Sequence, residues 1–154
     1  MNDITRRSAI ALLGLALPAT ALAGPSSPAI YTDMHGRALK GYDAVAYHLD
    51  RKPVKGKRAH TFEWKGAKWL FATAENLERF KADPERWAPQ YGGYCAWAIA
   101  QNRPAPINPT IFRIFDGKLY LNLNMPIHKK WLAKHQVFIA RANAKWPGVL
   151  EFKR

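Results

Sequence analysis

The segment from Pro84 to Trp97 concentrates the residue types that could carry chemistry. It contains the single cysteine of the chain, Cys95, shortly after the adjacent glycines Gly92 and Gly93. Adjacent glycines tolerate positive φ, so this pair predicts a sharp turn that leads into a short helix. A thiol in the first turn of that helix would face outward-pointing N–H groups and the positive end of the helix dipole, which favour the thiolate.

Two interpretations of Cys95 stay open at this level. Free cysteines are among the most frequently buried residues, and the apolar stretch from Ala96 to Ile99 suits a core. The other interpretation is a thiolate that ligates a metal or attacks a small molecule. The second interpretation includes a small redox or thiol-dependent enzyme with Cys95 as its nucleophile.

Motifs of other catalytic classes are missing from the sequence. It has no Ser-His-Asp elbow, no phosphate-cradling glycine loop and no dinucleotide fingerprint. Asp43 has no visible carboxylate partner for acid–base work, and a helix cap is the commoner explanation for it. No catalytic residue is therefore predicted, and a non-enzymatic role is favoured.

Aromatic residues around Asp43 and around the glycine pair define a candidate ligand site. Most large rings belong in a core, because they dominate burial, but rings can also wall a pocket for a small or planar ligand. The predicted ligand-binding residues are Tyr42, Asp43, Tyr47, Tyr91, Tyr94, Cys95 and Trp97.

A transition metal ion is the candidate cofactor, with Cys95, His48 and His60 as its candidate ligands. The histidines form no ligand motif in the sequence, so this set depends on an approach in space. His128 and His135 share a helix face, but the helical rise places them about 10 Å apart, too far for one ion.

Two hairpins are predicted. The runs 60–64 and 69–72 flank a turn at 65–67, and the alternating runs 110–115 and 118–123 flank Asp116-Gly117. We expect them to build one small antiparallel sheet.

Helices are predicted from capping residues and proline positions. Thr73 caps a helix that ends at Asp83, Pro84 starts a short one, and another covers 95–100. Asn124 caps a last helix that runs to Trp146. The predicted class is α+β, with helices packed against the sheet.

The N-terminus has the order of a secretory signal. Arg6 and Arg7 precede an apolar run, and Ala21 and Ala23 form a small-residue cleavage site, which predicts a twin-arginine-like signal at 1–23, with an ordinary Sec signal as the alternative. The mature protein is then periplasmic or otherwise exported. We expect a flexible lead-in at 24–38, one domain at 39–148 and a tail at 149–154.

The chain is strongly basic, with a formal net charge of +13. Such a surface suits anionic lipid, another anionic envelope surface or an acidic protein partner, and simple solvation is the plain alternative. Nucleic acid is not expected as a partner, because the chain is predicted to be exported and lacks aromatic-interleaved basic motifs.

From Gly41 to Pro147 the chain resembles exported YHS-domain proteins. The resemblance rests on Gly41-Tyr42-Asp43, on the segment from Trp69 to Asn76, and on 89–96, PQYGGYCA. Further matches are Asp116 to Asn122 and the terminal Trp146-Pro147. The resemblance implies a small domain of this type and, because some relatives handle metals, a possible metal role.

The chain departs from the metal-associated relatives where those carry soft ligands. The resemblance places their histidine at Leu70, their cysteines at Ala72 and Asn76, and their serine at Thr73. Thiolate ligation at that place is impossible here. The sequence therefore predicts an exported YHS-like module that binds a small ligand or metal ion, with the Cys95 enzyme and a basic adaptor as alternatives.

Overall fold

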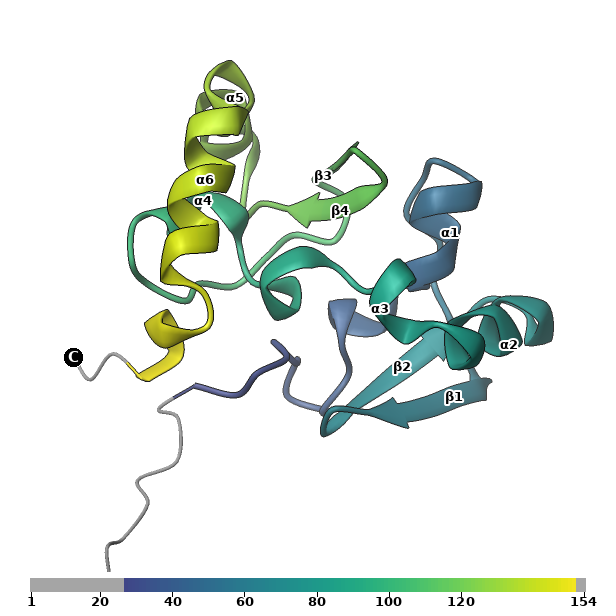
Figure 1. The fold of residues 1–154 in the computed structure, drawn as a ribbon. Coiled ribbons are helices and arrows are strands. Elements are labelled where there is room, and N and C mark those ends of the chain that lie inside the picture. The colour runs from purple at the N-terminus through teal and green to yellow at the C-terminus, as the bar shows by residue number, and fades with distance from the viewer. Residues whose placement is uncertain (1–26, 152–154) are drawn as a thin grey trace, which may run out of the picture.

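Two antiparallel hairpins and the helices packed on them make up residues 27–151, the part of the chain that the computed structural model describes (Figure 1). The predicted signal, with Arg6, Arg7, Ala21 and Ala23, lies outside the described residues. The predicted α+β class is confirmed.

The first hairpin pairs β1 (Lys57–Trp64) with β2 (Ala67–Phe71). Its turn is tight because Lys65 and Gly66 both adopt positive φ, 49° and 74°. The α2 helix (Ala74–Ala82) places Phe80 against this hairpin, with ring centroids 4.9 Å from Trp69 and 5.0 Å from Phe71. The short helices α1 (Ala44–Leu49) and α3 (Pro84–Trp87) complete this end of the molecule.

The second hairpin pairs β3 (Phe112–Phe115) with β4 (Lys118–Leu121) around Asp116-Gly117, as predicted. The two hairpins form two separate two-stranded sheets, so the expectation of one sheet is wrong. The outer edge of β4 is used by single bridges to Pro89 and Cys95, and the chain around the glycine turn therefore lies where another strand would pair.

The last helical segment is broken in two. The predicted single helix is α5 (Met125–Ala133) followed by α6 (His135–Lys145), with Lys134 in a non-helical conformation at φ −141° and ψ 37°. The apolar spacing continues across Lys134, so the periodicity hides the break. The break turns α6 back to pack on α4 (Ala96–Ala100), through buried small residues such as Ala142 (Figure 1).

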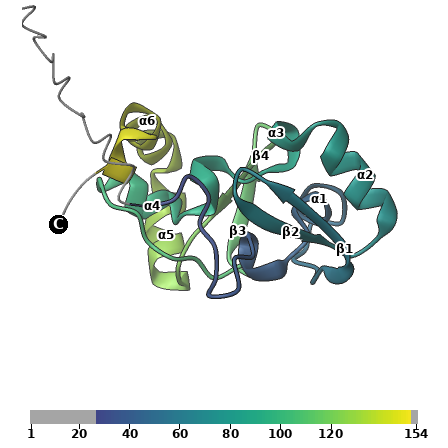
Figure 2. The same ribbon diagram turned by 90° about the horizontal axis from the view of Figure 1, so that it is seen from below.

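Figure 2 shows the two ends of the molecule, with β1, β2, α1 and α2 at one end and α4, α5 and α6 at the other. Each end has its own buried cluster, one around Trp69 and Phe80 and the other around Trp131 and Tyr120. The 3₁₀ turns η1 (Leu39–Gly41), η2 (Gln90–Gly93) and η3 (Gly148–Glu151) complete the described elements.

The flanking segments are part of the packed structure. In the predicted lead-in, Ile30 and Ala38 are buried, and the Tyr31 N–H donates to the carbonyl of Gly92. In the predicted tail, Val149 and Leu150 are buried. The expected boundaries at 39 and 148 are therefore too narrow for the folded unit.

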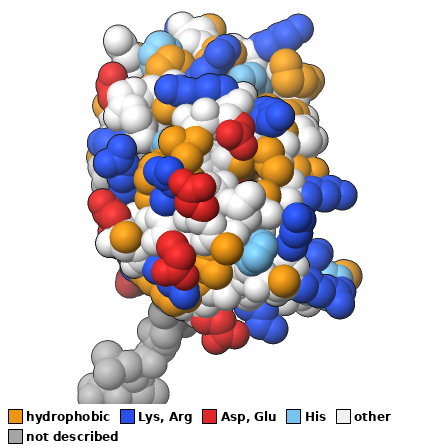
Figure 3. Space-filling model, turned by 90° about the vertical axis from the view of Figure 1, so that its right-hand side faces the viewer, with side chains coloured by type: hydrophobic (Ala, Val, Ile, Leu, Met, Phe, Trp, Pro, Cys, Tyr) orange, Lys and Arg blue, Asp and Glu red, His pale blue; other side chains and the backbone are white. Residues whose placement is uncertain are grey.

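Charge is distributed unevenly on one face of the molecule. On the face of Figure 3, Lys and Arg side chains gather along the right-hand edge, whereas Asp and Glu lie mostly toward the left and below. Within residues 27–151, no helix combines the length and the apolar character that crossing a bilayer requires.

The glycine turn yields a stability prediction. A Cβ at Gly92 would lie 1.9 Å from the carbonyl oxygen of Ala29, whereas a Cβ at Gly66 would meet open space. Both glycines have positive φ, so either change to Ala costs about 1–2 kcal/mol of conformational strain. We expect Gly92→Ala to lower the free energy of unfolding by at least about 2 kcal/mol more than Gly66→Ala, because only Gly92→Ala forces the backbone apart. Urea unfolding measures the difference, and equal losses would contradict the packing described here.

Candidate functional site

Asp43 is a buried structural hub rather than an exposed ligand group. Its side chain is 0% exposed, and Oδ1 accepts from the N–H groups of Val45 at 2.8 Å and Ala46 at 3.1 Å, which caps α1. Oδ2 accepts from the Ala72 N–H and from Asn76 Nδ2, both at 2.8 Å. The carboxylate therefore joins α1 to the junction between β2 and α2, and its acceptor capacity is used within the fold.

The predicted sharp turn at the glycine pair is confirmed. Tyr91, Gly92 and Gly93 have φ values of 56°, 59° and 82°. The Tyr91 hydroxyl donates to Asn143 Oδ1 at 2.8 Å, which ties the turn to α6. Burial raises the pKa of Tyr91 well above its ordinary value, so this phenol stays protonated near neutral pH.

Cys95 lies in the core. Its residue is 1% exposed, and its side chain does not cap α4, although it occupies the residue before that helix. The sulfur accepts a long hydrogen bond of 3.8 Å from Asn122 Nδ2. This geometry favours the buried structural interpretation.

A buried polar chain runs on from that sulfur. Asn122 Oδ1 lies 2.8 Å from His128 Nδ1, and Asn122 and His128 are 0% and 6% exposed. With Asn122 Oδ1 as acceptor, His128 donates from Nδ1. Sequence reasoning missed this chain, because Asn122 follows β4, His128 lies on α5 and Cys95 precedes α4.

The candidate metal ligands do not come together. Within residues 27–151, no three His, Cys, Asp or Glu side chains form a group that could hold a metal ion, so Cys95, His48 and His60 are not a ligand set. His48 is occupied elsewhere, with Nε2 3.2 Å from the carbonyl oxygen of Trp87 and its ring packed edge-on against that indole. His60 lies half-buried on β1.

The remaining predicted ligand residues serve separate contacts. The hydroxyl of Tyr47 donates to the carbonyl of Pro109 at 2.6 Å, and that of Tyr94 donates to Pro28 at 2.8 Å. Burial raises the pKa of Tyr94 to about 12. Tyr42 forms a backbone bridge to Lys55, and Trp97 is half-buried with the guanidinium of Arg103 over its ring. These side chains therefore do not form one shared pocket with Asp43 and Cys95.

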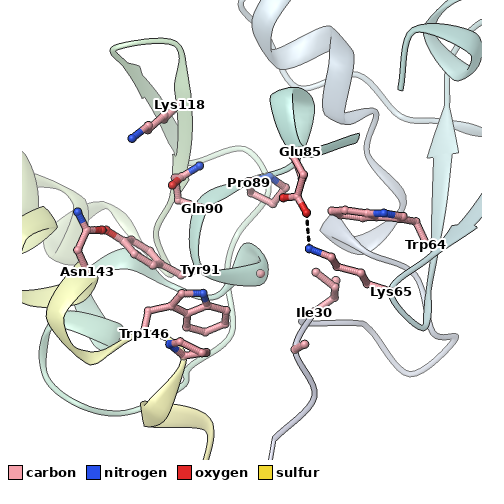
Figure 4. Close-up of a pocket in the computed structure, with 14 residues that line it drawn as sticks. Ile30, Trp64, Lys65, Glu85, Pro89, Gln90, Tyr91, Lys118, Asn143 and Trp146 are labelled. Atoms are coloured by element: carbon pink, nitrogen blue, oxygen red, sulfur yellow. Dashed lines mark hydrogen bonds and ion pairs between the residues drawn. The ribbon is translucent and has the colours of Figure 1, made fainter. Parts of the chain in front are cut away.

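A cleft of about 590 Å³ opens between the two ends of the molecule (Figure 4). One wall is Trp64 with Lys65 and Glu85, which form an ion pair. The opposite wall holds Tyr91, Asn143 and Trp146, so Tyr91 is the member of the predicted ligand set that lines this cleft. The other lining residues are Ala29, Ile30, Ala88, Pro89, Gln90, Gly92, Lys118 and Pro147.

The cleft combines aromatic rings with a few charged and amide side chains. Its lining contains no Cys, His, Ser or Thr, and Glu85 is its single carboxylate. The ammonium of Lys65 lies 4.4 Å from the ring centroid of Trp64 and pairs with Glu85. Lys118 is exposed, and no ion pair among the described residues includes it. The cleft therefore presents indole rings and an unpaired cation.

Comparison with known protein families finds a match for one segment of the chain. Residues 45–91 match the YHS domain, a span from α1 to Tyr91 that includes the first hairpin. No curated protein and no solved structure matches the chain. The matched segment contributes Trp64, Lys65, Glu85 and Tyr91 to the cleft, whereas Gly92, Asn143 and Trp146 follow it in the chain.

Because Asp43 accepts four hydrogen bonds, its substitution should reduce the stability of the fold. Asp43→Asn keeps one acceptor for the α1 cap but replaces Oδ2 with an amide that cannot accept from Ala72 and Asn76. We expect a loss of about 2–4 kcal/mol in the free energy of unfolding, because two donors lose their partner. Thr73→Ala, which removes a helix cap accepting from Asn76, should cost only about 1 kcal/mol. Urea unfolding compares the two variants, and a smaller loss for Asp43→Asn would overturn the hub.

Burial also makes stability depend on pH. Burial lowers the pKa of His128, and the nearby positive charge of Arg113 lowers it further. Burial also lowers the pKa of His48. The unfolded chain restores values near 6.5, so it binds more protons below that pH. The contribution of these neutral histidines to the free energy of unfolding is therefore fully present above about pH 6.5, and it is lost as the pH decreases through the folded-state pKa values.

We expect His128→Gln to reduce the stability difference between pH 7.5 and pH 5.5, and His48→Gln/His128→Gln to reduce it further. Urea unfolding at both pH values gives the difference. An unchanged difference in the double variant would show that these histidines do not govern it.

Proposed function

We propose that this protein is a non-catalytic YHS module that binds a small ligand in the cleft between its two ends. The observation that carries the proposal is the lining itself, with indole rings on both walls, an unpaired lysine at the rim and no cysteine, serine or threonine. Ligand sites commonly combine apolar walls with a few polar groups that fix orientation.

The lining also indicates the ligand class. Trp64 and Trp146 offer flat apolar surfaces from opposite walls, and Lys118 and Gln90 offer hydrogen-bond donors near the rim. A planar or ring-containing molecule with an acidic group would use both features. A metal ion has less support, because the described residues hold no cluster of three ligand side chains.

The thiol-dependent alternative has less support than binding. A nucleophile must reach its substrate, and Cys95 is almost fully covered. Export fits the binding proposal: the Arg6-Arg7 signal pattern would deliver the module to the periplasm, where it meets small envelope ligands.

A planar anionic probe tests the cleft. We expect 8-anilinonaphthalene-1-sulfonate to bind the folded full chain saturably at one site, with quenching of tryptophan fluorescence. Lys118→Glu should weaken binding at least about tenfold, or 1.4 kcal/mol, because it replaces the attractive charge at the rim. Lys130→Glu, an equal charge change on α5, should stay within about twofold of the unchanged chain.

Circular dichroism establishes that each variant is folded, because this probe also binds partly folded states. Absence of saturable binding, or equal weakening by both variants, would refute the cleft as the site.

A further inference from the structure

A second cavity, of about 500 Å³, is lined by residues that the cleft does not use. It lies between the first hairpin and the loop that precedes η1. Its lining is His35, Arg37, Arg58, Thr61, Lys68 and Leu70, so basic side chains dominate and no carboxylate contributes.

The charges around this cavity do not cancel. Arg37 is compensated, because its guanidinium contacts Asp33 Oδ2 through Nε at 2.8 Å and a terminal nitrogen at 2.7 Å. Arg58 and Lys68 take part in none of the ion pairs formed within residues 27–151. Glu63 lies opposite Lys68 in the strand register, yet the two side chains form no ion pair. Two cations on adjacent strands are therefore available to an anion.

The backbone around the cavity is held in place by hydrogen bonds. The register of β1 and β2 shifts between Lys57 and Thr61, and the Thr61 hydroxyl donates to the carbonyl of Arg58 at 2.8 Å. Irregularities of this kind redirect side chains at sheet edges. On the other side, the Lys68 N–H donates to Gly36 and the Ala38 N–H donates to Lys68, both at 2.9 Å. The segments that carry His35, Arg58 and Lys68 are thus joined before any ligand arrives.

We propose that this cavity binds a phosphate-type anion, with Arg58 and Lys68 as its principal contacts. A guanidinium can grip two phosphate oxygens with its planar fork, and an ammonium adds a compact charge. The imidazole of His35 supplies a further hydrogen-bonding group at the rim. The same chemistry recognises a free diphosphate and the headgroup of an anionic phospholipid. Anion binding in this cavity does not depend on ligand binding in the cleft.

Two probes distinguish those sources. Inorganic pyrophosphate is titrated calorimetrically into the full chain, and sedimentation with phosphatidylglycerol vesicles, against phosphatidylcholine vesicles, reports headgroup binding. We expect at least one probe to bind, and Arg58→Gln/Lys68→Gln to weaken that binding at least about tenfold. The matched control Lys129→Gln/Lys130→Gln removes the same charge from exposed positions on α5 and should stay within about twofold.

Pyrophosphate binding without vesicle binding identifies a free phosphate compound, and the converse identifies a lipid headgroup. Failure of both probes to bind, or equal weakening by the two double variants, overturns the proposal. Binding of the naphthalenesulfonate probe to Arg58→Gln/Lys68→Gln should be unchanged, which separates this site from the cleft.

Discussion

The run of positive φ angles at Tyr91, Gly92 and Gly93 is the constraint on which the cleft depends. A non-glycine residue in this region costs about 1–2 kcal/mol, and here the cost falls on Tyr91. The fold offsets it with a buried ring, a hydroxyl bond to Asn143 and a backbone bond from Tyr94 N–H to the Tyr91 carbonyl. Gly92 is needed for a separate reason, because the backbone at Ala29 leaves no room for a side chain. The strain therefore places Tyr91 between the two ends of the molecule.

Buried polar groups in this protein join its elements, whereas exposed charged groups lie at its surface cavities. Asp43 and the chain from Cys95 through Asn122 to His128 are enclosed, and their hydrogen bonds join elements that are distant in sequence. Such groups stabilise one arrangement of helices and hairpins, because breaking their hydrogen bonds leaves a buried donor or acceptor without a partner. Lys118 at the cleft and Arg58 at the basic cavity are exposed instead, and the two proposed binding sites depend on such accessible side chains.

Local signals in the sequence predicted most of the elements. Asp116-Gly117 and the caps Asp43 and Thr73 act within a few residues, so their effect is readable without a structure. The break at Lys134 was not readable, because no proline or glycine marks it and tertiary packing on α4 decides it. The cleft was largely hidden for the same reason. Its walls join Trp64 to Trp146, and no spacing rule connects residues so far apart.

The Asp43 hub lies where this chain departs from the metal-associated relatives that it resembles. The resemblance places their cysteines at Ala72 and Asn76, and both of these residues here donate hydrogen bonds to Asp43 Oδ2. The change is therefore more than the loss of two thiolates, since Asn76 supplies a neutral donor to a buried carboxylate. A dication at this place would have to compete with two hydrogen bonds and would find no soft ligand. In this chain, the region that the resemblance associates with metals is a structural junction whose polar groups are paired within the fold.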